Sequence, residues 1–433
     1  MRPIIIFDTQ KKSVQDIINY YKNQQLDLNP SFQRSSVWSN RDRAKLIDSI
    51  LRNYPLPSIF LYKREISDGT IVYDVIDGKQ RLESIFYFIG EMRGNRFQTK
   101  TQLDVNGPEE WIDWNDIKRR KLHLRITDYM LQVINVTGEP SDVIDLFIKI
   151  NSTGKALTGS EVRHARYFKS DFLKRADQIA DRYSNYFRAT KIISQSQISR
   201  MKHIELICEL MVSAHFEDVI NKKAALDKIM KSESLEGRQL DKAAKLTITS
   251  LNRLKRMFPQ LGQTRFSKLS DFYSLAVLIQ KFEREGLILI NAKRNKLAWG
   301  ILRKFANGVD DVDLKRKKME NTEPGEELYR QYLLTVREGT DEINHRRDRE
   351  RILQGLLKPL YEKKDSERLF SPEQRRILWN STTARKCTEC RRTLTWEDFT
   401  IDHIHPHSKG GQTRLDNAAL MCRKHNSQKG NRT

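Results

Sequence analysis

The chain has 433 residues, enough for about three domains, and its 78 Lys and Arg outnumber 56 Asp and Glu to give a formal net charge of +22. This excess favours polyanionic partners, although it carries no information on specificity. No apolar run approaches the roughly 20 residues of a membrane helix, no secretory signal opens the chain, and three of the four cysteines gather near the C-terminus. These features exclude a membrane protein and a disulfide scaffold, and we expect a soluble cytoplasmic protein.

Strand and helix patterns alternate through the first 168 residues. Residues 57–64, 71–76 and 131–136 have strand patterns, and the apolar residues after position 81 recur at helical spacing. The spacing Thr158-Gly159-Ser160-Glu161 is typical of a capping box and predicts a helix start there. This part is therefore expected to be a mixed α/β or α+β domain.

The turn Asp77-Gly78-Lys79-Gln80-Arg81 follows the strand predicted at 71–76 and precedes a predicted helix. A strand, a glycine-containing turn and a helix start place backbone N–H groups and the helix dipole where an anion can bind. Lys79 and Arg81 would add positive charge, and Asp77 would hold a metal or a ribose. The motif alone is equally compatible with an ordinary turn.

Further motifs surround this turn in order: Pro30-Ser31-Phe32-Gln33-Arg34 with Val37-Trp38, Lys45 to Leu51, Tyr54-Pro55-Leu56-Pro57 and Ile150 to Leu157. Together they resemble the ParB/sulfiredoxin-like DGQQR-motif domain of GmrSD-type modification-dependent restriction systems and of the SspE phage-defence protein, over about residues 10–168. Lys79 stands where that family usually has Gln. The resemblance implies NTP binding and hydrolysis at Asp77, Gly78, Gln80 and Arg81. Arg34 is expected either to contact a nucleotide phosphate or the DNA backbone, or to be a salt-bridged surface arginine.

Helical periodicity dominates from about residue 167 to residue 364, without a Walker-type phosphate loop or an internal repeat. The charged stretch 310–351 is interpreted as solvated helix faces and loops, with a DNA-contacting surface as the alternative. We expect three domains, at residues 1–168, 169–370 and 371–433.

Near the C-terminus, two pairs of metal-binding residues have the spacing of a tetrahedral zinc site. The ligands are Cys387, Cys390, Cys422 and His425. Few apolar residues surround them, so zinc is expected to hold this small unit folded. The four ligands alone are also compatible with a zinc ribbon that only binds DNA.

Between and beside these pairs lie Asp402, His403, Asn417 and Asn426. Residues 399–404 alternate like a strand, and the stretch from 423 to 430 suits a short helix. Asp402 and Asn426 offer oxygen ligands suited to Mg²⁺ or Mn²⁺, and His403 is a candidate general base. The segment resembles an HNH (ββα-metal) nuclease. That resemblance assigns these roles, makes Asn417 the brace of the loop that orients His403, and places His425 where the family usually has Cys.

The predicted fold is thus multidomain α+β, with a ParB/sulfiredoxin-like α/β domain, an all-helical middle domain and a ββα-metal nuclease domain with a zinc site. The predicted function is a nucleotide-regulated HNH DNA endonuclease or nickase of a bacterial anti-phage defence system, of the modification-dependent restriction type, with NTPase activity as a further hypothesis. Its expected partners are DNA, including modified phage DNA, a nucleotide, and a second copy or a defence partner protein. The alternatives are a zinc-dependent, non-cleaving DNA-binding regulator related to ParB, and an HNH nuclease that acts on RNA.

Overall fold

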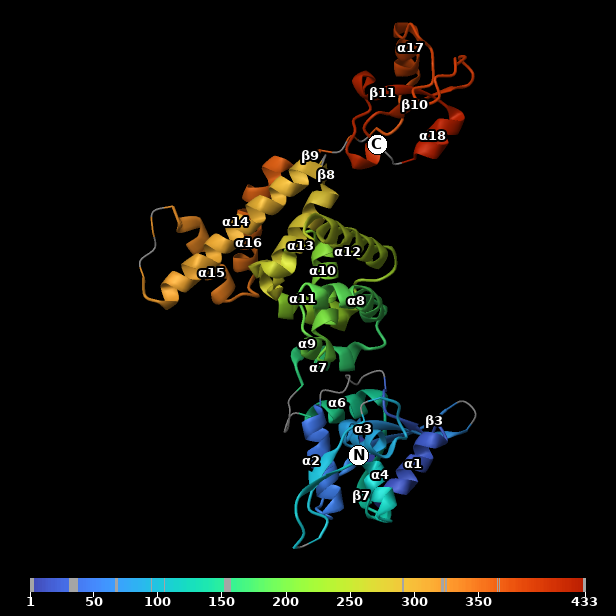
Figure 1. Ribbon diagram of the computed structural model, residues 1–433, viewed down its shortest axis with the longest axis vertical. Helices are drawn as coiled ribbons and strands as arrows, with labels where there is room; N and C mark the ends of the chain where they lie inside the picture. Colours follow the sequence, from blue (N-terminus) through green and yellow to red (C-terminus); the bar gives the residue numbers. More distant parts are fainter. Residues whose placement is uncertain are drawn as a thin grey trace. The chain divides into compact units, whose positions relative to one another are not determined.

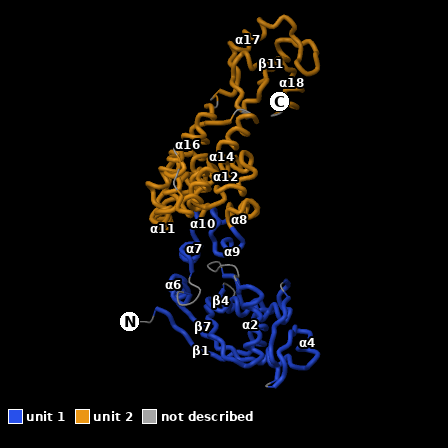
Figure 2. The backbone as a smooth tube through the Cα atoms, turned by 60° about the vertical axis from the view of Figure 1, so that its left-hand side comes forward, with its two compact units in different colours: residues 1–177, 194–205 blue, residues 178–193, 206–433 orange. Residues whose placement is uncertain are grey.

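The computed structural model describes residues 4–30, 38–66, 69–94, 96–104, 106–151, 157–289, 292–320, 323, 325–363, 365 and 367–430. The chain divides into two compact units, which Figure 2 distinguishes by colour: Met1–Asp177 with Ser194–Glu205, and Gln178–Ile193 with Leu206–Thr433. The domain limits expected at 168 and 370 stay predictions.

A five-stranded mixed sheet forms the centre of the first unit (Figure 1). Its strand order is β1-β7-β3-β4-β2. The bounds are Ile5–Ser13 for β1, Leu26–Asp27 for β2, Ile59–Glu65 for β3, Ile71–Asp77 for β4 and Met130–Gly138 for β7. β1 is antiparallel to β7, β7 is parallel to β3, β3 is antiparallel to β4, and β4 is parallel to β2. The predicted strands at 57–64, 71–76 and 131–136 are confirmed as β3, β4 and β7.

The inner strands of this sheet are covered on both faces, since alternate side chains of a strand point to opposite sides, whereas most side chains of the edge strand β1 are exposed. Ile59 and Leu61 of β3 join one buried cluster, whereas Phe60 packs against the other. Helices α6 (Pro140–Ile150) and α7 (Gly159–Tyr167) contribute to the second cluster. The first cluster is built by α1 (Val14–Lys22), α2 (Asn40–Leu51), α3 (Lys79–Ile89), α4 (Trp114–Arg119) and α5 (Leu124–Thr127).

A two-stranded ribbon, β5 (Thr99–Thr101) with β6 (Glu110–Ile112), completes this unit beside α2. The start of α7 confirms the predicted capping box, since the Thr158 side chain accepts a hydrogen bond from the Glu161 backbone N–H and the Glu161 side chain accepts one from the Thr158 N–H.

The predicted helical region is confirmed. In this region α13 (Leu269–Arg284) is largely buried and packs against α12 and α16. The helical region also contains a short antiparallel ribbon formed by β8 (Leu287–Ile288) and β9 (Glu362–Lys363). The helices are α8 (Asp171–Ala189), α9 (Gln195–Ser199), α10 (Lys202–Phe216), α11 (Lys222–Ser232), α12 (Gly237–Met257), α14 (Ala292–Lys317), α15 (Glu327–Arg337) and α16 (Ile343–Leu357), with 3-10 turns at Leu261–Gln263, Arg265–Ser267 and Lys358–Leu360.

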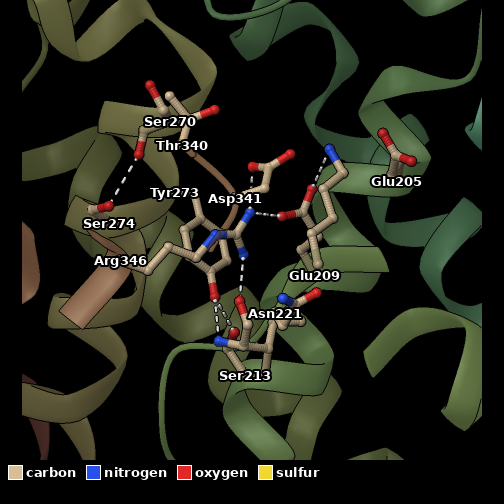
Figure 3. A network of polar contacts seen from close by, with 12 residues as sticks. Glu205, Glu209, Ser213, Asn221, Ser270, Tyr273, Ser274, Thr340, Asp341 and Arg346 are labelled. Carbon is tan, nitrogen blue, oxygen red and sulfur yellow. Dashed lines mark hydrogen bonds and ion pairs between the residues drawn. The ribbon is translucent and has the colours of Figure 1, made fainter. Parts of the chain in front are cut away.

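A buried polar network runs through this region (Figure 3). Arg346 of α16 is only 2 % exposed. Its Nη2 donates to Glu209 Oε2 at 2.7 Å and to Asp341 Oδ1 at 2.8 Å, and its Nη1 donates to the Ile220 carbonyl at 3.1 Å. The guanidinium also lies 3.9 Å from the ring centroid of Tyr273. These contacts offset the free-energy cost of removing the Arg346 charge from water.

Arg349, one turn further along α16, is fully buried as well. It donates to Ser274 Oγ at 2.9 Å, to the Thr340 carbonyl at 2.6 Å and to the Thr335 carbonyl. The interpretation of residues 310–351 as solvated helix faces is therefore wrong for Arg346 and Arg349. Three of their partners, Glu209, Ile220 and Ser274, come from distant parts of the chain, so local patterns did not indicate this burial.

The last part of the chain is a small ββα module (Figure 1). It contains α17 (Pro372–Ser381), β10 (Phe399–His403), β11 (Ala418–Cys422) and α18 (Arg423–Lys429), with 3-10 turns at His407–Lys409 and Leu415–Asn417. The strand expected at 399–404 and the helix expected at 423–430 are both confirmed. Its buried apolar cluster is small and consists of Cys387, Leu394, Phe399, Leu420, Met421 and Cys422.

A helix that combines the length and the apolar character needed to cross a bilayer is not found in the described part of the chain.

Candidate functional site: the ββα module and the Asp77 turn

Strands β10 and β11 form an antiparallel ribbon that carries both halves of the predicted nuclease site. Phe399 pairs with Cys422 at one end, and His403 pairs with Ala418 at the other. Asp402 and His403 therefore lie at the end of β10 that leads into the loop before Asn417. The predicted zinc ligand Cys422 thus lies at one end of the ribbon, and the catalytic candidates lie at the other.

Helix α18 packs against β10 and brings a cation to Asp402. Lys429 Nζ lies 2.9 Å from Asp402 Oδ2 and donates to the His403 carbonyl at 2.9 Å. Asn426 lies three residues before Lys429, so the two side chains share the face of α18 that is turned towards β10. The structure thus places the predicted oxygen ligands, Asp402 and Asn426, on facing elements.

Asn417 closes the loop after β10, as predicted. Its Oδ1 accepts a hydrogen bond from the His405 N–H at 2.8 Å, and its Nδ2 donates to the carbonyls of His405 at 3.1 Å and Gln412 at 2.8 Å. Gly411 makes this closure feasible, because a Cβ at that position would lie 1.7 Å from the His405 carbonyl oxygen. Any side chain at residue 411 would force the loop apart.

His403 is almost enclosed, with 6 % of its surface exposed. Its Nε2 lies 3.0 Å from Thr413 Oγ1, and its ring packs against Phe370 with centroids 4.6 Å apart. Burial lowers the pKa of His403, and the nearby His407 lowers it further, despite the opposing effect of Asp402. The neutral imidazole that a general base requires is thus the favoured form near neutral pH.

The four predicted zinc ligands are brought together. The candidate ligand atoms of Cys387, Cys390, Cys422 and His425 all lie within 4.8 Å of one another. His425 Nδ1 lies 3.7 Å from Cys387 Sγ and 3.3 Å from Cys422 Sγ. Tetrahedral zinc with bonds of about 2.0–2.3 Å needs ligand separations of roughly 3.3–3.8 Å. The two His425 distances match this range, and the widest separation of the set, within 4.8 Å, would have to contract by up to about 1 Å around the ion.

The Cys387 thiol is prepared for metal binding. Burial alone would raise the pKa of this thiol, but hydrogen bonds from the backbone N–H groups of Cys390, Cys422 and Glu389, and from His425, lower it to about 6. A thiol with this pKa is largely thiolate at neutral pH, and the thiolate is the form that binds zinc.

In the first unit, the Asp77 turn brings the backbone of Gly78 close to the side chain of Ile59. Gly78 has a φ of +98°, and a Cβ there would lie 2.4 Å from Ile59 Cδ1. Gly78 is also the N-cap of α3 and provides no side-chain cap. Gly78 itself therefore offers no side chain that would compete with an anion at the start of α3.

The charged residues of this turn are engaged within the protein. Arg81, only 8 % exposed, pairs with Asp77 and donates to the Pro57 carbonyl at 2.6 Å. Lys79 Nζ donates to Asn29 Oδ1 at 2.6 Å. A nucleotide at this site would therefore meet Arg81 as one half of an ion pair.

Some predicted positions lie outside the described residues, namely Arg34 and residues 152–156 of the Ile150 to Leu157 motif. Conversely, no role was predicted for Lys429 or Thr413, both of which contact the predicted catalytic residues. Lys429 follows Asn426 by one helical turn, which is the only local signal that could have identified it. Nothing in the sequence near Thr413 indicated its contact with His403.

Comparison with known protein families agrees with this arrangement at both ends of the chain. Residues 14–168 match the family described as GmrSD restriction endonuclease, N-terminal domain, and residues 387–432 match the family described as HNH endonuclease. A search of curated proteins found no match. The two matches together support a restriction-type HNH nuclease. The chain is therefore a fusion of a GmrSD-type N-terminal domain with a C-terminal HNH endonuclease domain, as its motifs predict.

Proposed function

We propose that this protein is a divalent-metal-dependent HNH DNA endonuclease or nickase, regulated by a nucleotide, that serves bacterial anti-phage defence by modification-dependent restriction. The observation that supports it most is the placement of Asp402 and His403 at the end of β10, with α18 and the Asn417 loop on either side and a Cys3His cluster holding the ribbon.

His403 acts as the general base in this proposal. Its burial lowers its pKa, so that the neutral ring can take a proton from water near neutral pH. The water oxygen bonds to phosphorus, the ester bond on the opposite side breaks, and the leaving oxygen takes up a proton from solvent. Asn417 keeps the loop after His403 closed and so fixes where the base stands.

Asp402 and Asn426 would hold Mg²⁺ or Mn²⁺. Both offer the oxygen ligands that these hard cations prefer. The ammonium group of Lys429 already lies beside Asp402, so this carboxylate is placed to hold a positive charge. The ion would supply charge neutralisation on the phosphate and the leaving oxygen. Lys429, which also holds the His403 carbonyl, then shares Asp402 with the ion or turns towards the phosphate.

The Cys3His cluster would hold a structural zinc ion. Its four ligands close the coordination sphere, as structural zinc sites do, and no ligand position is left for substrate. The small apolar core of the module makes such support necessary.

The GmrSD-type domain is the proposed sensor. The anion site at the start of α3 would bind a nucleotide phosphate through backbone N–H groups, and Asp77 and Arg81 would exchange their mutual ion pair for contacts with the nucleotide. Binding would thereby change the loop before α3 and report the nucleotide to the rest of the chain.

The central test incubates the full chain with plain plasmid DNA, phage-modified DNA and RNA, in Mg²⁺ or Mn²⁺, with and without each NTP. Cleavage of DNA that needs the divalent ion and is absent in His403→Ala is the expected result. Intact DNA under all these conditions would favour the non-cleaving regulator, and cleavage restricted to RNA would replace the substrate.

The nucleotide part is tested separately by calorimetric titration with ATP, GTP, CTP and UTP, together with phosphate release. Arg81→Ala and Asp77→Ala should weaken binding, whereas Arg120→Ala should not, since Arg120 is a surface residue paired with Glu110. If the wild type binds none of the four nucleotides, with or without DNA, the turn is structural.

A further inference from the structure

Thr413 is held on all its polar groups by Asp365, Glu367 and Gln374 of α17, which precede the segment matched to the HNH family. Its N–H donates to Asp365 Oδ2 at 2.7 Å, its carbonyl accepts from Gln374 Nε2 at 2.9 Å, and its hydroxyl donates to the Glu367 carbonyl. It is also buried, with 5 % exposed. We call Asp365 and residues 367–370 the linker strap.

The direction of these hydrogen bonds determines where the proton of His403 lies. A hydroxyl has one proton to donate, and a carbonyl such as that of Glu367 can only accept. The Thr413 hydroxyl therefore gives its proton to Glu367 and presents a lone pair to His403 Nε2, 3.0 Å away. A neutral His403 must then carry its proton on Nε2, which leaves Nδ1 as the nitrogen that can accept one.

The strap also fixes the orientation of the imidazole. Phe370 packs on the ring of His403 with centroids 4.6 Å apart, and the ring of His407 lies 5.6 Å away on a histidine that is itself hydrogen-bonded to the Asp365 carbonyl at 3.0 Å. Rotation of the His403 ring by half a turn would keep the plane of the ring, and with it this packing, but would place Cε1 instead of Nε2 beside Thr413 and so break that hydrogen bond.

We propose that Thr413 is a positioning residue for the nuclease reaction, and that the linker strap is part of the catalytic unit. The relay from Glu367 through Thr413 holds His403 as the Nε2–H tautomer and directs Nδ1 to the attacking water. The inference rests on the proposed role of His403 as the base. It also extends the functional nuclease beyond the residues matched to the HNH family, 387–432, because the strap lies N-terminal to them.

The test compares Thr413→Val, Thr413→Ser and Thr400→Val in the full chain. Valine keeps the shape of threonine but can neither accept from His403 nor donate to Glu367, whereas serine keeps both hydrogen bonds. Thr400→Val is the matched control, because Thr400 lies in β10 and its hydroxyl donates to the Met421 carbonyl at 3.0 Å without touching His403.

The first readout needs no substrate. In protein with ¹⁵N-labelled histidine, at a pH where the ring is neutral, the His403 signal is assigned by its loss in His403→Gln. We expect the Nε2–H tautomer in the wild type, in Thr413→Ser and in Thr400→Val, and a mixture with the Nδ1–H form in Thr413→Val. The second readout is cleavage, where kcat of Thr413→Val should fall about 10- to 100-fold with KM unchanged, while zinc content and melting temperature stay those of Thr400→Val.

An Nδ1–H tautomer in the wild type, or unchanged tautomer and kcat in Thr413→Val, would overturn the relay. Equal losses in Thr413→Ser and Thr413→Val would overturn it too, since they would show that shape rather than hydrogen bonding matters. A wild type that holds the Nε2–H tautomer but cuts no nucleic acid would instead refute the proposed function and leave the relay intact.

Discussion

The helical region and the nuclease module use their polar side chains in opposite ways. In the helical region, Arg346 and Arg349 are buried and every contact they make stays within the protein. In the module, the buried polar side chain of His403 faces the predicted reaction site, and the thiols and imidazole of the Cys3His cluster converge on a common point. In the first region buried charges find their partners within the fold, whereas in the second the buried polar groups meet at a proposed reaction site and at a cluster that could hold zinc.

The largest effect that would sharpen this contrast is expected for Cys422→Ser. Zinc binding by small domains is worth about 10–16 kcal/mol of folding free energy at neutral pH, so loss of one thiolate should release zinc, unfold the module and abolish cleavage. Metal analysis and limited proteolysis measure this directly. Cys208→Ser is the control, since Cys208 lies in the apolar core of α10 and should leave the zinc content at one ion per chain. Absence of zinc from the wild type would contradict the prediction.

In the helical region, Arg346→Met should lower the free energy of unfolding by about 3 kcal/mol, because the buried Glu209 loses its arginine and keeps only Lys222, at 3.0 Å. Arg347→Met is the matched control. Arg347 is next along α16 but is 54 % exposed and pairs with Asp218 at the surface, so its loss should cost less than about 1 kcal/mol. Urea denaturation measures both variants, and equal losses would show that the buried network has no special role in stability.

His403→Ala should reduce the rate of cleavage about 100-fold or more, which is the usual effect of losing a general base. Zinc content should stay unchanged, because the ring is not a zinc ligand, whereas loss of its packing on Phe370 should lower the melting temperature. His405→Ala serves as control, since Asn417 holds His405 through its backbone groups alone and cleavage should stay within a few-fold of wild type. Near-normal cleavage by His403→Ala would refute the nuclease assignment.

The smallest effect concerns His164 of α7, a buried titratable group in the first unit. Burial lowers its pKa to about 4, and the charge of His203 contributes in the same direction. The unfolded chain therefore takes up this proton first as the pH falls from about 6.5, and the stability contributed by the neutral ring is lost progressively down to about pH 4.

From this pKa we expect a loss of about 2 kcal/mol between pH 7 and pH 5. Urea denaturation at each pH should show that His164→Gln removes this part of the pH dependence and that substitution of the exposed His123 by Gln does not. Identical pH profiles for the wild type and His164→Gln would mean that the ring is solvated in the native state.

Local sequence patterns correctly predicted the strands and the helix start that short stretches of the chain determine. The apolar run at 71–76 became β4, alternation at 399–403 became β10, and the spacing of Thr158 and Glu161 became the cap of α7. The Cys3His cluster followed from ligand spacing, because a tetrahedral site imposes similar turns on any chain that forms it.

Other features depend on residues that are distant in sequence. The burial of Arg346 requires Glu209, 137 residues away. Which atom donates in the hydrogen bond between His403 and Thr413 depends on Glu367, 46 residues before Thr413. No periodicity or spacing encodes such partners. The strand order β1-β7-β3-β4-β2 was unpredictable for the same reason, since β1 pairs with a strand from the far end of its domain.

The pairing of Phe399 with Cys422 has a consequence for how errors would arise in this enzyme. A ribbon of five ladder pairs has little capacity to resist sliding, and a slip by one residue would turn Asp402 towards the apolar interior and Phe399 out of it. A zinc ion held by Cys387, Cys422 and His425 would tie β11 to the segments on either side of it, and we expect it to oppose such a slip. Oxidation of these thiolates would then be expected to yield molecules that are folded in outline but misaligned at the catalytic end.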